Sequence, residues 1–276
     1  MIVKLRIFLI RIIIVFLDKR RPYIMIGAII GDIAGSSYEF DNDMEHYDLD
    51  LFREGTTFTD DTVCTIAVAD AILHGKSYES SLLEWCHRYP GRGYGGRFLG
   101  WLLSAAPKPY GSYGNGSAMR VSPVGWAFET IESTRAQAEC SAEPTHNHPE
   151  GIKGAQVIAE AIFRLRCGEW DKIQELLISS YGADYESNLP AAGVFDETCQ
   201  GCVPLALTIL LRSTGYEDAI RSAIHYGGDS DTLAAIVGGM AEAYYGVPDD
   251  LVKKALTYLP DEMCWVYEDF RSKYMQ

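Results

Sequence analysis

The chain has 276 residues, 47% of them apolar, which is enough for one large domain with a full hydrophobic core. Its formal net charge of −14 at pH 7 argues against nucleic acid as a general partner, because phosphate backbones are bound through Lys and Arg. The seven cysteines form an odd set without the spacing of a disulfide scaffold, which predicts a reducing, cytoplasmic compartment.

The N-terminal segment, residues 2–24, is basic and strongly apolar. Its apolar run is too short to cross a bilayer as a helix, and no small-residue cleavage site follows it, as a secretory signal would need. Three interpretations stay open: an interfacial anchor, an uncleaved membrane segment, and translated sequence upstream of the true start. We favour the third, because orderly patterning begins at Met25. We therefore expect residues 1–24 to lie outside the fold and residues 25–276 to form a single domain.

From residue 26 onward, apolar residues recur mostly at helical spacing. Few segments alternate with the period of two that is typical of strands, and no unit of 20–50 residues repeats. Helices are expected in the runs that follow Val63 and Leu233, and over residues 151–167, 170–180, 201–213, 216–226 and 249–258. The sequence thus predicts a compact all-α domain with glycine-rich loops between its helices.

Two acidic clusters each precede a helix-like apolar run. The first contains Thr59, Asp60 and Asp61, and the second contains Asp229, Asp231 and Thr232. If the two helix starts meet, four carboxylates converge and repel one another unless cations offset them. Mg²⁺ and Mn²⁺ take oxygen ligands of this kind, so the pair of clusters predicts a dinuclear metal site.

The competing interpretation is that each cluster only caps its helix. Asp and Thr are preferred N-caps, and negative charge is favourable at a helix N-terminus, so either cluster alone is better explained as a cap. A cap uses one such residue, however, whereas each cluster supplies two carboxylates. On this ground alone, the metal site and the pair of caps are about equally well supported.

Two glycine-rich loops, residues 91–96 and 111–117, carry a further signal. Glycines allow backbone N–H groups to point at an anion, although neither loop matches a P-loop or a dinucleotide-binding fingerprint. Tyr94, Tyr113 and Asn115 lie within the loops and suit stacking on a base and bonding to sugar hydroxyls. The alternative is a pair of flexible surface loops, and composition alone supports both equally.

Glu39 and His146 are single candidates in loops. Glu39 lies between the aromatic residues Tyr38 and Phe40, where a raised pKa would suit a general acid or base, although a solvated loop glutamate is the usual case. His146 lies in the sequence Thr145-His146-Asn147-His148, and we expect it to donate a hydrogen bond to phosphate or ribose rather than to bind metal.

Taken together, these segments resemble the ADP-ribosylglycohydrolase family. The matching stretches occur in the family's order and are GAIIGDIAGSSYEF (27–40), FTDDT (58–62), GRGYGGRF (91–98), GSYGNGSAMRVSPVGW (111–126), THNHPEGIKGA (145–155) and YGGDSDTLAAIVGGMAEAYYG (226–246). Each motif is weak alone, while the ordered set is highly specific.

The resemblance implies an orthogonal helical bundle with two Mg²⁺ or Mn²⁺ ions in a cleft. It assigns metal binding to Thr59, Asp60, Asp61, Asp229, Asp231 and Thr232, and catalysis to Glu39 with Asp60 and Asp61. It assigns the ADP-ribose cleft to Gly95, Ser112, Tyr113, Asn115, Gly116, Met119 and His146, with Tyr113 near adenine. The stretch before Gly111 departs from some relatives, because a second adenine-stacking aromatic is not obvious and Tyr110 is its only candidate.

The implied activity is hydrolysis of the bond between ADP-ribose and a modified protein or a small conjugate. Three alternatives stay open. They are a protein that binds ADP-ribose without turnover, a two-metal nucleotide phosphohydrolase, and a regulator tethered to a membrane through residues 2–24.

Overall fold

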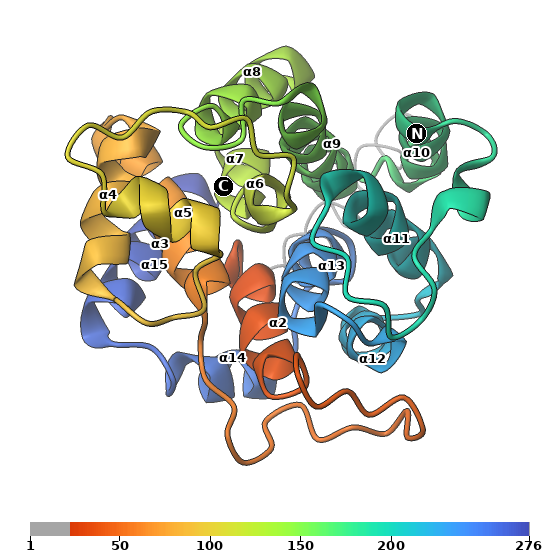
Figure 1. The fold of residues 1–276 in the computed structure, drawn as a ribbon. Coiled ribbons are helices and arrows are strands. Elements are labelled where there is room, and N and C mark those ends of the chain that lie inside the picture. The colour runs from red at the N-terminus through yellow and green to blue at the C-terminus, as the bar shows by residue number, and fades with distance from the viewer. Residues whose placement is uncertain (1–22, 276) are drawn as a thin grey trace, which may run out of the picture.

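The computed structural model describes residues 23–275, and the expectations for residues 1–22 lie outside the described part. The described residues form a helical bundle, shown in Figure 1. The helices are α2 (Ile26–Ser36), α3 (Asp60–His74), α4 (Tyr78–Arg88), α5 (Gly96–Leu102), α6 (Gly116–Met119), α7 (Ser122–Ala127), α8 (Ile131–Ala142), α9 (Pro149–Arg166), η1 (Trp170–Lys172), α10 (Ile173–Tyr181), η2 (Tyr185–Asn188), α11 (Cys199–Arg212), α12 (Tyr216–Tyr226), α13 (Ser230–Tyr245), α14 (Asp249–Leu256) and α15 (Asp261–Tyr274). Residues 23–275 contain no strand, only one isolated bridge between Gly114 and Thr198, so the all-α prediction is confirmed.

The predicted helices are found with small shifts at their ends. α11 begins two residues before the expected residue 201, because the Thr198 side chain accepts a hydrogen bond from the Gly201 N–H and caps the helix. α14 ends at Leu256 rather than at 258, where the Thr257 hydroxyl donates to the carbonyl of Lys254.

The centre of the fold is the antiparallel pair α2 and α13, the red and blue helices that lie side by side in Figure 1. Glycines of α2 allow their backbones to approach closely. A Cβ on Gly31 would lie 2.0 Å from the carbonyl oxygen of Ala234, and one on Gly35 would lie 2.5 Å from Cα of Asp231. This contact places the end of α2 against the start of α13, where the second acidic cluster lies.

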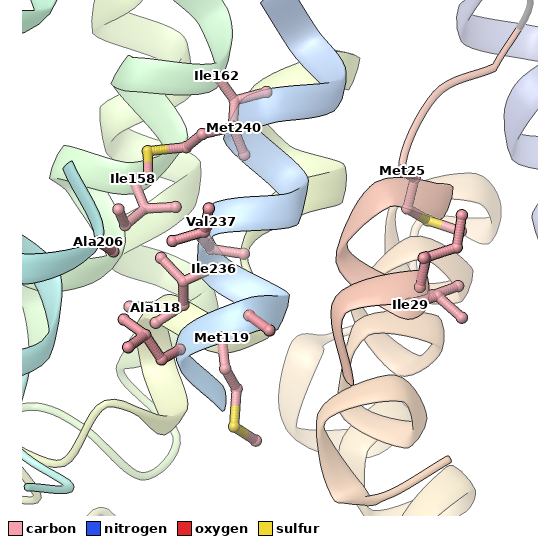
Figure 2. Close-up of a cluster of buried hydrophobic side chains, with 14 of the residues drawn as sticks. Met25, Ile29, Ala118, Met119, Ile158, Ile162, Ala206, Ile236, Val237 and Met240 are labelled. Carbon is pink, nitrogen blue, oxygen red and sulfur yellow. The ribbon is translucent and has the colours of Figure 1, made fainter. Parts of the chain in front are cut away.

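The other face of α13 packs into the main core. Figure 2 shows Val237 and Met240 of α13 beside Ile158 and Ile162 of α9, and all four side chains are at most 1% exposed. Removing such side chains from water is the main favourable contribution to folding. The α2–α13 pair is therefore a buried, rigid support for the residues at its end.

The described fold begins slightly before Met25. Ile24 is 2% exposed and belongs to the core, and the Tyr23 hydroxyl donates to Asp249 Oδ1 at 3.0 Å. Among the helices of residues 23–275, none has both the length and the apolar character that crossing a bilayer requires.

Candidate metal and substrate site

The structure brings the two acidic clusters together at one cleft. Thr59 is the N-cap of α3, which starts at Asp60, and α13 starts directly after Asp229. The Thr232 hydroxyl donates to Asp61 Oδ1 at 3.3 Å, which joins the two helix starts. Five of the six predicted metal ligands line the cleft: Asp60, Asp61, Asp229, Asp231 and Thr232. Their role as ligands stays a prediction.

Thr59 is placed differently from the other five. Its hydroxyl donates to Asp32 Oδ1 at 2.7 Å and accepts from the backbone N–H of Asp61 at 3.3 Å. The residue thus caps α3 and lies behind the lining of the cleft. Thr59 therefore caps α3 while Asp60 and Asp61 line the cleft, and its role as a metal ligand stays a prediction.

Glu39 reaches the same cleft from the loop that follows α2. One carboxylate oxygen each from Glu39, Asp229 and Asp231 lie within 4.8 Å of one another. Asn42 fixes this loop to the second cluster, since its Oδ1 accepts from the Gly228 N–H at 2.8 Å. Burial, and then the charge of Asp229, raise the pKa of Glu39 to about 7, so it is not an ordinary solvated loop glutamate.

The carboxyl groups of the cleft raise one another's pKa. Burial and the charge of Asp32 raise the pKa of Asp60 to about 8, and burial and Asp231 raise the pKa of Asp61 well above its usual range. Asp61 Oδ2 is buried and has no hydrogen-bond partner. Clustered carboxylate oxygens, one of them unpartnered, are the donor set that hard divalent cations prefer, so the residues fit such ions.

Asp32 is a site residue that the sequence analysis did not single out. It is fully buried in α2, and Oδ2 accepts from the backbone N–H groups of Thr59 and Thr62 at 3.0 and 3.1 Å. The Thr62 hydroxyl donates to Oδ2 as well. A lone charged residue within the apolar run 26–35 was the signal for it, because a buried carboxylate needs partners.

Another part of the cleft lining is cationic. Arg97 and the fully buried Arg120 both line it, together with Tyr110 and His146. The Arg97 guanidinium lies 4.8 Å from the centre of the Tyr110 ring. Neither arginine was predicted. Arg120 interrupts an otherwise apolar stretch and was detectable for that reason, whereas nothing in the pattern marked Arg97. Carboxylates and cations thus both line one cleft, which has a volume of about 260 Å³.

His146 is oriented by a short hydrogen-bond chain. Arg120 Nη2 donates to Thr145 Oγ1 at 2.9 Å, and Thr145 Oγ1 lies 2.7 Å from His146 Nδ1. Burial, and then the charge of Arg120, hold the pKa of His146 well below its usual range, so the ring is neutral at neutral pH. His146 Nε2 lies beside Gly114 and Gly116 of the cleft, and a Thr145 hydroxyl that donates to Nδ1 would leave the ring proton on Nε2.

The glycine-rich loops supply the walls of the cleft. Gly95, Ser112, Gly116 and Met119 all line it, as does Gly93. Gly93 has φ 99°, and a Cβ there would lie 3.2 Å from Asp60 Oδ1, so this position favours glycine for both its backbone and its proximity to the carboxylate. The loops are therefore parts of the site rather than free surface.

Asn115 lines the cleft as expected, whereas Tyr113 lies beside it. Asn115 is buried in the cleft, and its Nδ2 donates to Asp229 Oδ2 at 2.6 Å, so its amide group orients a carboxylate. Tyr113 is 44% exposed and lines a neighbouring depression, with its ring edge-on to His148. Tyr110, rather than Tyr113, is the tyrosine that lines the cleft.

Comparisons with known proteins agree with one another. The family model described as ADP-ribosylglycohydrolase matches residues 21–272. The alignment with ADP-ribosylhydrolase ARH3 of Homo sapiens is 311 residues long at 26% identity. It covers 80% of this chain and 84% of that protein. The alignment with ADP-ribosylarginine hydrolase Tri1 of Pseudomonas putida is 276 residues long at 26% identity. It covers 83% of this chain and 72% of that protein. A solved structure titled ADP-ribosylglycohydrolase-related protein complex superposes with a TM-score of 0.72 at 22% identity, covering 93% of this chain and 98% of that chain, and shows the same fold.

Proposed function

Because the chain belongs to the ADP-ribosylglycohydrolase family, we propose that it hydrolyses the glycosidic bond between ADP-ribose and a modified acceptor. The acceptor is a protein side chain or a related small conjugate, and the reaction reverses the modification. The observation that carries this proposal is that clustered carboxylates and two arginines line the same cleft.

The cationic residues of the cleft suit the diphosphate part of the substrate. Arg97 and Arg120 place positive charge beside His146, whose neutral ring offers Nε2–H as a donor. Backbone N–H groups of the glycine-rich loops are suited to phosphate oxygens as well. Tyr110 supplies the aromatic surface for the base, in the place that the sequence analysis gave to Tyr113.

The carboxylates of the cleft suit the ribose whose glycosidic bond is cleaved. Asp60, Asp61, Asp229, Asp231 and Thr232 would hold two Mg²⁺ ions, with Mn²⁺ as the other metal that this donor set accepts. When bound, the ions supply positive charge that offsets the carboxylates and polarises oxygen atoms of the substrate. Thr232 and Asn115 keep Asp61 and Asp229 in place through the hydrogen bonds described above.

Glu39 is the candidate for proton transfer. A carboxyl group with a pKa of about 7 exists in both protonation states near neutral pH, so it can donate a proton to the departing acceptor or accept one from the attacking water. The transition state develops positive charge at the anomeric carbon, and the neighbouring carboxylates stabilise that charge.

The proposal is tested by binding and by product analysis. ADP-ribose is titrated by calorimetry into three samples: Mg²⁺-loaded protein, the same protein after chelation of the metal, and Asp60→Ala protein. We expect the affinity for ADP-ribose to be at least tenfold weaker in the second and third samples than in the first. In parallel, the protein is incubated with serine-linked and arginine-linked ADP-ribosyl peptides and the products are identified. Release of ADP-ribose supports the proposal, whereas release of AMP, with a ribose phosphate left on the peptide, would indicate a phosphohydrolase. Binding without any product would indicate a non-catalytic ADP-ribose-binding protein.

A further inference from the structure

Two aromatic side chains form an exposed stacked pair on the surface. Phe40 is 85% exposed and Phe195 is 43% exposed. Their rings are nearly parallel, with centroids 5.9 Å apart and an interplanar angle of 12°. Phe40 lies in the loop between α2 and α3, and Phe195 lies in the loop between η2 and α11. The pair therefore joins two loops without contributing to the core.

The pair lies at the mouth of the cleft. Phe40 directly follows Glu39, and Phe195 lies two residues before Glu197, and both glutamates line the cleft. Phe195 also lines the neighbouring depression, which shares Arg97, Ser112, Gly114 and Glu197 with the cleft. A group bonded to the ribose at Glu39 would leave the cleft beside these two rings.

The loops around the pair are acidic. Residues 39–50 contain six Asp and Glu residues and no Lys or Arg, and residues 189–200 contain two acids and no Lys or Arg. Two ion pairs reduce this charge, Arg53 with Asp41 at 2.9 Å and Arg221 with Asp48 at 3.4 Å, while His46 forms a hydrogen bond with Asp43 at 3.1 Å. Glu45, Asp50, Asp196 and Glu197 have no such ion pair among those found in the described residues, so the mouth keeps a net negative charge.

We propose that Phe40, Phe195 and the surrounding carboxylates form an acceptor platform that binds a cationic peptide segment next to the modified residue of a protein acceptor. This inference rests on the proposed function, because it names the chemistry of the acceptor for the same site. Lys and Arg side chains are attracted to the face of an aromatic ring and to carboxylates, and the pair of rings offers both kinds of contact at one place. An exposed apolar pair ringed by charge is typical of a recognition surface.

The test compares two ADP-ribosyl peptides that differ only in the residues flanking the modified side chain, Lys and Arg in one and Gly and Ser in the other. Each peptide is made with serine-linked and with arginine-linked ADP-ribose, and kcat/KM for ADP-ribose release is measured with Mg²⁺. We expect the wild-type protein to prefer the basic peptide by about fivefold or more, and to lose this preference as salt rises.

Two variants and a matched control complete the test. The first variant is Phe195→Ala, and the second combines Phe40→Ala with Phe195→Ala. In both, the ratio of kcat/KM for the basic peptide to that for the Gly and Ser peptide should fall close to one. The single variant leaves the residue beside Glu39 unchanged, so a general loss of activity is separated from a loss of preference. Trp265→Ala removes another exposed aromatic, 67% exposed on α15, and should keep the wild-type ratio.

The two proposals fail in different ways. Equal rates for both peptides in the wild-type protein, or a preference that survives in both variants, would overturn the platform while leaving the hydrolase intact. Absence of ADP-ribose release from all four peptides would overturn the proposed function, and the platform with it.

Discussion

Asp32 Oδ1 accepts a hydrogen bond of 2.7 Å from the hydroxyl of Thr59, so a buried carboxylate of α2 fixes the N-cap of α3. Asp32 Oδ2 accepts from the N–H groups of Thr59 and Thr62 as well. Asp60 and Asp61 lie between these two threonines in the chain. The orientation of the first acidic cluster thus depends on a residue that does not line the cleft.

Asp32→Ala should therefore weaken the site through its support. The variant leaves buried donors of α3 unpaired and frees the start of the helix, so we expect the Mg²⁺ concentration for half-maximal activity to rise about 10-fold to 100-fold. The control is Asp70→Asn, which changes another buried carboxylate that accepts from Trp85 Nε1 and Lys76 Nζ. That control should lower the thermal midpoint without changing the Mg²⁺ dependence. An equal shift in both variants would mean that Asp32 stabilises the fold and nothing more.

Glu39→Gln should separate turnover from binding. The amide has the same shape but cannot transfer a proton, so the rate of ADP-ribose release should fall about 100-fold or more. The affinity for ADP-ribose, measured by calorimetry, should change little. Glu54→Gln, an exposed glutamate of the same loop outside the acceptor platform, should keep both values. A parallel loss of affinity and turnover in Glu39→Gln would assign Glu39 to binding instead.

The sequence predicted the helical class and seven of the helical segments because apolar periodicity is a local signal, as along α12 and α13, but it did not mark helices such as α4, α8 and α15. It also selected the two acidic clusters, because their charge exceeds what capping uses. It could not show that Thr59 faces Asp32 instead of the cleft, since that depends on how α2 packs against α3.

Other parts of the site depend on distant contacts and were missed. Asn115 lies 114 residues from Asp229 in the chain, and composition could not reveal that its amide bonds to that carboxylate. Glu197 belongs to a loop without a distinctive pattern, so only the fold places it in the cleft, and Arg97 lies in the motif 91–98 but was not assigned to the site. Arg120 and Asp32 were detectable in principle, because each is a single charge within an apolar run.

Gly35→Ala should damage the fold and the site together. A Cβ at this position would lie 2.5 Å from both the carbonyl oxygen of Ser230 and Cα of Asp231, so α2 and α13 would have to separate where the second cluster begins. We expect a loss of about 1–3 kcal/mol in the free energy of unfolding and weaker Mg²⁺-dependent binding of ADP-ribose. Gly100→Ala in α5 is the matched control, because nothing lies within 4 Å of the added Cβ. It should be neutral or slightly stabilising. Unchanged stability in Gly35→Ala would show that the helix pair tolerates a wider spacing.

Glu242→Gln should change how stability depends on pH. Glu242 is fully buried on α13 and accepts a hydrogen bond from the Gly27 N–H at 3.0 Å, and burial raises its pKa from 4.5 to about 8. Between these two values the folded protein holds a proton that the unfolded chain has released. The free energy of unfolding therefore falls as pH rises through this window, and Glu242 contributes most stability below it. A rise in pKa of this size corresponds to a change of roughly 3–6 kcal/mol in the free energy of unfolding across the window.

The measurement is denaturant unfolding of Mg²⁺-loaded protein at several pH values between 5 and 9, for the wild type and the variant. Other carboxyl groups titrate in both proteins, so the difference between the two curves isolates Glu242. Because Gln stays neutral, the variant should gain stability relative to the wild type as pH rises. Glu79→Gln, an exposed glutamate on α4, should follow the wild-type curve. Parallel curves for the wild type and Glu242→Gln would mean that Glu242 is ionised throughout, with the hydrogen bonds at the start of α2 sufficient to hold its charge in the core.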